Sequence, residues 1–142
     1  MEHSFKQQVC YCDTDAFGVV WHGSYLRWLE MGRIGFCDDM GLNLIDLQKQ
    51  DIVMPVTNIN VRYKASAKAY DNLVIKTVIS KITPLSVTFE QTITNAETGV
   101  LYIQAAVDVV AVNNAGKLYR RFPDIVKNAF DRISKEALLC SV

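Results

Sequence analysis

The sequence lacks three features that would point to a partner or a compartment. Fifteen basic residues balance fifteen acidic ones, so no overall field attracts nucleic acid or an anionic membrane surface. No apolar run approaches the roughly 20 residues of a membrane span, and the start of the chain is too polar for a secretory signal. We therefore expect a cytoplasmic protein without a transmembrane segment, in which any anion-binding site is local.

The sequence also lacks the paired cysteine spacings of a disulfide framework. Cys10 and Cys12 lie two residues apart on a predicted strand, which is the wrong spacing for the Cys-x-x-Cys of zinc and redox sites. Cys37 and Cys140 have no close cysteine neighbour in the sequence. We interpret all four as reduced thiols that pack within the fold.

Apolar residues, by contrast, are plentiful enough for one core. Half of the 142 residues are hydrophobic and about a fifth are charged, which fits one globular domain that buries roughly 70% of its unfolded surface. No linker, internal repeat or low-complexity segment interrupts the chain. The predicted organisation is a single domain over residues 1–142.

The order of predicted elements indicates an α+β fold. A first strand is expected over about residues 5–11, and a helix from about Gly23 or Ser24 to Met40, where Gly41 supplies a stop signal. Pro123 opens a C-terminal amphipathic helix. Further strands are expected over residues 52–64, 73–82, 86–94 and 100–112, with a short one near residues 118–121.

The predicted internal helix has the pattern of a buried helix, because apolar side chains occupy more than one of its faces. Gly32 and Gly35 support this, since each costs a helix about 1 kcal/mol relative to alanine unless a neighbour approaches the backbone closely. The long strands are joined by short connectors that suit antiparallel hairpins. A long antiparallel sheet of about five strands wrapped around one central helix is the expected architecture.

The segment Asp13–Tyr25 joins the first strand to this helix and carries acids, a histidine and two glycines. Read from the residues alone, Asp13 and Asp15 are turn residues that accept hydrogen bonds from nearby amides. His22 lies at the helix entrance, where backbone amides lack intrahelical partners and the positive end of the dipole gathers. Its side chain fits a packed core histidine or a group that handles protons.

The motif Tyr11–Val20 (YCDTDAFGVV), followed by His22, Tyr25 and the pair Glu30 and Arg33, carries a recognisable signature. It resembles the 4-hydroxybenzoyl-CoA thioesterase family of the hotdog superfamily. The Asp-Thr-Asp start with His22 is most similar to the bacterial branch encoded beside the tol-pal envelope genes. The resemblance covers nearly the whole chain.

The resemblance implies a hotdog fold, dimers that join two sheets and often tetramers, and acyl-CoA thioester hydrolysis at the subunit interface. Such hydrolysis needs a group that attacks or activates water and a donor that stabilises the oxyanion. It needs no metal or redox cofactor. The family's catalytic aspartate matches Asp15, as nucleophile or as general base. The backbone amide at His22 matches the group that polarises the thioester carbonyl, and the side chain there is linked to activity.

Substrate contacts also follow from the resemblance. Gly23 lets the backbone approach the substrate, and Thr57 and Asn58 fall where relatives line the acyl pocket across the dimer interface. Lys68 falls where relatives carry a basic residue, and Ser86 where some use a serine near CoA. Lys64, Arg120 and Arg121 are further candidates for CoA phosphates.

Two departures from the family pattern leave open whether the acyl group is carried on CoA or on acyl carrier protein. Thr83-Pro84-Leu85 lacks basic residues that some relatives place before this serine, and Ser66 replaces a proline common in the branch. A thioester carried on acyl carrier protein, or a CoA held mainly through its acyl part, therefore stays an alternative. Glu30 and Arg33, three residues apart on one helix face, are expected to form a structural ion pair.

Two other functions compete with hydrolysis, and a metal site is a further variant. A hotdog module could bind an acyl or aromatic ligand without turnover, although Asp15 and His22 argue for chemistry. A hotdog hydratase or dehydratase would use an Asp and a His five positions apart, whereas these two are seven apart. A metal site from Asp13, Asp15 and His22 is weaker still, because catalytic zinc takes three well-placed ligands, mostly His or Cys.

Overall fold

The structure is a computed structural model that describes residues 1–140, with side chains described through residue 135. Its elements in chain order are β1 (His3–Gln8), the 3-10 turn η1 (Tyr11–Asp13), α1 (Ser24–Asp39), α2 (Leu44–Lys49), β2 (Val56–Tyr63), β3 (Asn72–Ile82), β4 (Ser86–Asn95), β5 (Leu101–Val110) and α3 (Asp124–Cys140). No helix in this described part is both long and apolar enough to cross a membrane.

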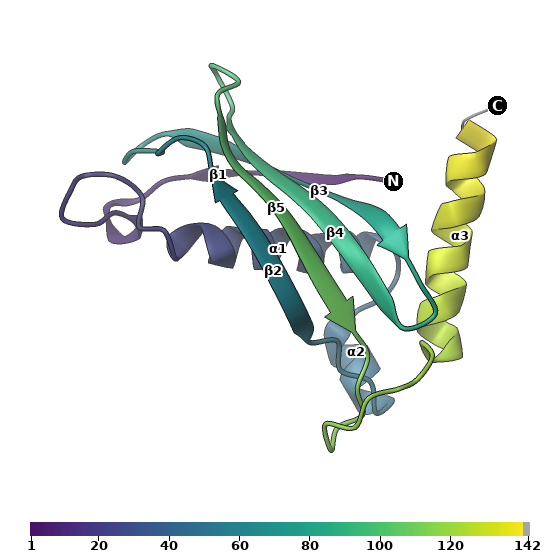
Figure 1. The fold of residues 1–142 in the computed structure, drawn as a ribbon. Helices are drawn as coiled ribbons and strands as arrows, with labels where there is room; N and C mark the ends of the chain where they lie inside the picture. Colours follow the sequence, from purple (N-terminus) through teal and green to yellow (C-terminus); the bar gives the residue numbers. More distant parts are fainter. Residues whose placement is uncertain (141–142) are drawn as a thin grey trace.

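The five strands form one antiparallel sheet in the order β1-β3-β4-β5-β2, with β1 and β2 at its edges. The helix α1 runs across one face of this sheet, and α3 lies near the end of the sheet where β3 turns into β4 (Figure 1). The α3 residues Val126, Ala129 and Phe130 are buried in one core cluster with residues of α1 and the sheet. The predicted sheet around a central helix, followed by a C-terminal helix, is confirmed. The short helix α2 was not predicted.

The inner face of the sheet and α1 form the core. Alternate residues along β5 point inward and are buried, as a half-covered strand requires. On the helix side, Trp28, Leu29 and Phe36 are fully buried, and the Phe36 ring packs edge-on against Phe89 at 5.7 Å between centroids. Burial of these large apolar side chains is the main term that holds helix and sheet together.

The two helix glycines mark the closest approaches between α1 and the strands. A Cβ atom at Gly32 would lie 2.6 Å from Thr77 Oγ1 and 3.0 Å from Gln91 Nε2, and one at Gly35 would overlap the His3 ring. Gln91 donates from Nε2 to the Leu29 carbonyl and to Thr77 Oγ1, both at 2.8 Å. The predicted close approach is therefore confirmed, and at Gly32 it is a buried polar network.

Several predicted boundaries are wrong for local reasons. The first strand ends at Gln8, and Cys12 lies in η1, so Cys10 and Cys12 do not share a strand face. Residues 118–121 form no strand, only an isolated bridge between Val112 and Leu118. Among the cysteines with described side chains, Cys10 and Cys12 are exposed and Cys37 is buried, so the packing interpretation holds for Cys37 only. The side chain of Cys140 lies outside the described residues.

The second strand also differs from expectation. It begins at Val56, after a single bridge at Val53, and its predicted buried face is largely open. Ile59 and Tyr63 are exposed, and only Val61 is half-buried. The reason is position: β2 is an edge strand, and no other part of the described chain covers its flank.

Candidate functional site

The two acids of the loop before α1 have different surroundings. Asp13 is 2% exposed, and its carboxylate accepts from Arg27 Nη2 at 2.6 Å and from the Cys10 N–H at 2.8 Å. Both of its oxygens are therefore used to hold the turn. The interpretation of Asp13 as a turn residue is confirmed, and a metal site that needs this carboxylate has no free oxygen there.

Asp15 is half-buried in a tight turn whose backbone is fixed at both ends. The Asp15 N–H donates to the Val19 carbonyl at 2.9 Å, and the Gly18 N–H donates to the Asp15 carbonyl at 3.1 Å. Gly18 has φ of 78°, which glycine adopts without strain. The Phe17 N–H donates to Asp15 Oδ1 at 2.8 Å. Within the described chain, Oδ2 has no hydrogen-bond partner, so one carboxylate oxygen is held and the other is free.

The helix entrance is built on bonds back to the same loop. The Trp21 N–H donates to the Asp13 carbonyl at 2.8 Å, and the Ser24 N–H donates to the Trp21 carbonyl at 2.9 Å. In a planar trans peptide the N–H points opposite to the carbonyl, so the His22 N–H points away from Ser24. The His22 and Gly23 amides have no acceptor within the described residues. They are free donors directly before the helix, since Gly23 is the N-cap of α1 and His22 precedes it.

Asp15 and His22 line the same cavity of about 360 Å³. The remaining lining residues come from the loop, the start of α1 and the end of β2: Val19, Val20, Tyr25, Tyr63, Lys64, Ala65 and Ser66. Burial raises the pKa of the Tyr25 phenol, whose oxygen accepts the Ala67 N–H at 3.0 Å. The cavity thus combines a carboxylate, an imidazole and a helix entrance with free amide donors.

Other predicted contact residues lie outside this cavity in the single chain. Thr57 and Asn58 are at the start of β2, and Thr57 lies about 20 Å along the strand from Tyr63. Ser86 is the first residue of β4, next to the turn from β3, and its hydroxyl is 3.1 Å from Thr83 Oγ1. Lys68 is exposed and its backbone pairs with Val19. The structure therefore brings Asp15 and His22 together but not the other four side chains.

Tyr63 had been assigned no role in this cavity from the sequence. Tyr63 donates its hydroxyl to the His22 carbonyl at 3.0 Å, and its ring meets Tyr25 edge-on at 5.9 Å between centroids. Alternation along β2 had placed Tyr63 on a buried face, and nothing in that pattern pairs it with the helix entrance. Lys64 is the one basic candidate for CoA phosphates that lines the cavity.

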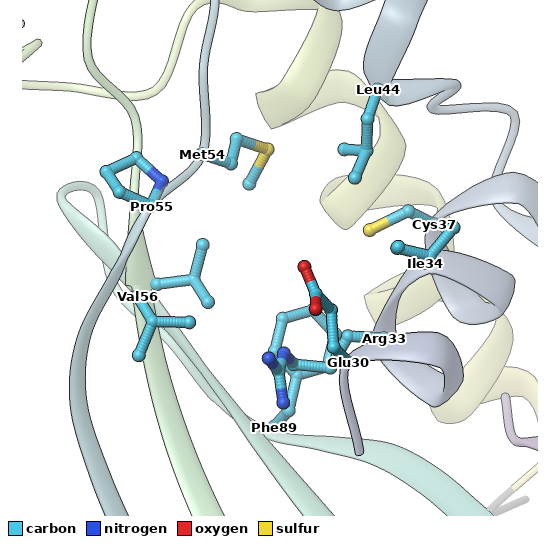
Figure 2. Close-up of a pocket in the computed structure, with 10 residues that line it drawn as sticks. Glu30, Arg33, Ile34, Cys37, Leu44, Met54, Pro55, Val56 and Phe89 are labelled. Atoms are coloured by element: carbon cyan, nitrogen blue, oxygen red, sulfur yellow. The ribbon is translucent and has the colours of Figure 1, made fainter. Parts of the chain in front are cut away.

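A second cavity, of about 190 Å³, lies farther along α1 (Figure 2). It is lined by Glu30, Arg33, Ile34, Cys37, Leu44, Met54, Pro55, Val56, Phe89 and Val109. The expected Glu30–Arg33 ion pair is wrong, since no contact within 4.0 Å joins them; Arg33 Nη1 instead donates to Gln91 Oε1 at 2.9 Å. Burial lowers the pKa of Arg33 and raises that of the Cys37 thiol to about 12.

Comparisons with known proteins agree with this geometry. The acyl-CoA thioesterase YbgC of Haemophilus influenzae is 31% identical over 132 residues, which cover 92% of this chain and 95% of that protein. The acyl-CoA thioester hydrolase YbgC of Escherichia coli is 33% identical over 123 residues, covering 87% and 91%. The crystal structure of the DHNA-CoA thioesterase from Staphylococcus aureus superposes with a TM-score of 0.87 at 27% identity, covering 99% of this chain and 96% of that one.

The family model described as the thioesterase-like superfamily matches residues 11–130, which include the whole sheet from β2 onward, α1 and the loop with Asp15. The hotdog fold and the family resemblance predicted from the motif are both confirmed, and the similarity to the tol-pal branch agrees with the match to the YbgC proteins. This chain belongs to the thioesterase-like superfamily.

Proposed function

We propose that this protein hydrolyses an acyl-CoA thioester to the free acid and the CoA thiol, with Asp15 and the entrance of α1 as its catalytic groups. The observation that carries the proposal is the shared cavity: it is lined by Asp15, whose carboxylate is held through one oxygen only, and by His22, whose backbone amide has no described partner. The names of the relatives supply the substrate class, since several are acyl-CoA thioesterases.

The reaction follows from these groups. The thioester carbonyl oxygen accepts from the His22 N–H, where the helix dipole also stabilises developing negative charge. The carboxylate of Asp15 then attacks the carbonyl carbon, or takes a proton from a water molecule that attacks it. Collapse of the tetrahedral intermediate breaks the carbon–sulfur bond and releases the CoA thiolate. On the nucleophilic route, water then hydrolyses the acyl-aspartate anhydride and restores the carboxylate.

The CoA-binding part of the proposal rests on Lys64, Lys68 and Ser86. Lys64 lies at the cavity and can meet a phosphate directly. Lys68 lies beside the loop that carries Asp15, because its backbone pairs with Val19 of that loop. Ser86 and the remaining acyl-pocket residues Thr57 and Asn58 reach a site only if a second subunit supplies one.

A homodimer through β2 would provide that second subunit. The edge of β2 is open, and a free strand edge offers unpaired backbone donors and acceptors. Val56 and Ile59 are exposed apolar side chains on β2, and Ile34 on α1, which lines the second cavity with Val56, is exposed as well. Antiparallel pairing of two β2 strands places the start of one beside the end of the other, so the partner subunit's Thr57 and Asn58 would approach the cavity at Tyr63. Two such dimers can form a tetramer.

The test is a thiol-release assay with purified protein on acyl-CoAs of graded chain length and on aromatic acyl-CoAs. We expect turnover that EDTA leaves unchanged, whereas loss of turnover restored by zinc would favour the metal alternative. Tight binding of every acyl-CoA without thiol release would favour the non-catalytic module. Light scattering during size exclusion should show a dimer or tetramer, and an active monomer would contradict a shared site. The cytoplasmic location stays a prediction.

A further inference from the structure

Tyr63 is the only side chain of the sheet whose described hydrogen bonds reach the helix entrance. It is the last residue of β2 and lines the cavity with Asp15 and His22. Its hydroxyl donates to the His22 carbonyl at 3.0 Å. Its ring is held in place by the edge-on contact with Tyr25, whose own hydroxyl is bound to the Ala67 N–H. The Tyr63 ring is 50% exposed, so this contact with Tyr25 and the hydrogen bond to the His22 carbonyl together set the direction of its hydroxyl.

This hydrogen bond completes the fixing of the His22 backbone. The peptide before His22 is held through the Trp21 carbonyl, which accepts from the Ser24 N–H. The peptide after His22 is held through the His22 carbonyl, which accepts from Tyr63. Because each peptide is planar, anchoring both fixes the two dihedral angles of His22. The fixed backbone then sets the direction of the His22 N–H and the position of the Cα from which its imidazole side chain extends.

The anchor after His22 has no substitute within the loop. Two further bonds at the entrance, from the Trp21 N–H and from Ser24 Oγ, end on the Asp13 carbonyl, and the Leu26 N–H donates to the Gly23 carbonyl. None of these bonds involves the His22 carbonyl or the Gly23 N–H. Without the Tyr63 hydroxyl, the His22–Gly23 peptide would keep no described partner for either its carbonyl or its N–H. A helix entrance that stabilises an oxyanion must be fixed before the reaction, because preorganisation is the source of the effect.

We propose that Tyr63 is a positioning residue for thioester hydrolysis, acting by holding the His22 carbonyl so that the amide and side chain of His22 face the substrate. This inference rests on the proposed function. It assigns Tyr63 no contact with the reacting atoms. It also links the end of the edge strand β2 to the geometry of the catalytic loop.

The test compares Tyr63→Phe with Tyr119→Phe. Both variants keep the ring and lose one hydroxyl bond to a backbone carbonyl, since Tyr119 donates to the Asp51 carbonyl at 2.7 Å, away from the cavity. Tyr63→Phe should lower kcat about three- to tenfold, the effect of one lost neutral hydrogen bond, with KM within about twofold. Tyr119→Phe should leave kcat and KM unchanged. An unchanged kcat in Tyr63→Phe, or a change in KM alone, overturns the proposal.

A second readout does not depend on turnover. The amide proton and nitrogen resonances of Gly23 belong to the peptide whose carbonyl Tyr63 holds, so they should shift in Tyr63→Phe and stay in place in Tyr119→Phe. Unmoved Gly23 resonances would show that Tyr63 does not hold this peptide, whatever the kinetics. If the parent protein releases no thiol from any acyl-CoA, the hydrolase proposal fails, while the Gly23 resonances still decide whether Tyr63 holds the helix entrance.

Discussion

The helix α1 and the strand β2 border a cavity at each end of their shared length, and the two cavities differ in chemistry. At the entrance of α1, Tyr25 and Tyr63 stand beside Asp15, His22 and free backbone amides. About 18 Å along the helix, Cys37 and Val56 belong to the second cavity. There, the Arg33 guanidinium is bound to Gln91, and most other lining residues are apolar.

The two cavities differ in how their polar groups are bound to the fold. In the second cavity Arg33 is tied into the network of Gln91, Thr77 and the Leu29 carbonyl, which joins helix to sheet. At the entrance, Asp15 Oδ2 and the His22 N–H have no partner in the described chain. Because Asp15 and His22 both line the entrance cavity, these unpartnered groups are available to a substrate there.

The largest expected effect separates the two acids of the loop. Asp15→Asn keeps the size of the side chain but removes its charge, and should lower kcat for acyl-CoA hydrolysis by about 10²- to 10⁴-fold with little change in thermal stability. Asp13→Asn is the matched control, because it weakens the bonds to Arg27 and the Cys10 N–H. It should lower the free energy of unfolding by about 1–3 kcal/mol. Parental kinetics in Asp15→Asn would remove this residue from the mechanism.

The thiol of the second cavity should be almost inert. Because burial raises the pKa of Cys37 from 9.0 to about 12, its thiolate fraction at pH 8 is about a thousandfold lower than that of an ordinary thiol. Mass spectrometry after iodoacetamide treatment should find Cys10 and Cys12 modified and Cys37 protected, with protection lost in urea.

The raised pKa of Cys37 also predicts how the free energy of unfolding changes with pH. The folded pKa lies above the ordinary value, so the neutral Cys37 thiol favours the folded state below pH 9, and this contribution is lost as the pH rises toward 12. Cys37→Ala should flatten that part of the stability profile. Rapid labelling of Cys37 in the folded protein at pH 8 would contradict the buried position.

His22→Ala should have an intermediate effect at the entrance cavity. It removes the imidazole but leaves the backbone N–H, so kcat should fall by about a hundredfold, the low end of the range for proton-handling groups. His3→Ala is the control and should keep parental kcat, because His3 lies on β1, the edge strand opposite β2, and its ring bonds to Asp39 at the end of α1. Equal activity of the two variants would leave only the backbone of His22 with a role.

The smallest expected effect concerns the helix between the two cavities. Alanine usually stabilises an exposed helix by about 1 kcal/mol over glycine. At Gly32 the added Cβ would press on Thr77 and Gln91, so Gly32→Ala should instead lower the free energy of unfolding by about 1–2 kcal/mol. Urea denaturation of the variant and the parent shows directly whether the free energy of unfolding falls or rises. A stabilised variant would show that the sheet does not approach the helix this closely.

The sequence was most informative where one pattern dominates. Strand alternation and the helical repeat predicted the sheet and the central helix, and Gly32 predicted their close contact, because such local patterns reflect which face is buried. The motif also brought Asp15 and His22 into one site. These features depend on neighbours in sequence or on a single dominant packing choice.

What the sequence could not predict depends on contacts between distant residues. Arg33 was expected to pair with Glu30 three residues away, but Gln91 on β4 offers a buried acceptor instead. Tyr63 reaches His22 across 41 residues, and no spacing rule describes such a bond. The exposed flank of β2 was missed because alternation cannot tell an edge strand from a central one.

The most direct test of the central claim is a crystal structure of Asp15→Asn with an intact acyl-CoA bound. The account predicts the thioester carbonyl oxygen within hydrogen-bond distance of the His22 N–H, and the carbonyl carbon about 3–3.5 Å from the side chain at position 15. A thioester held in the cavity of Cys37 and Val56, or with its carbonyl turned away from the start of α1, would contradict it.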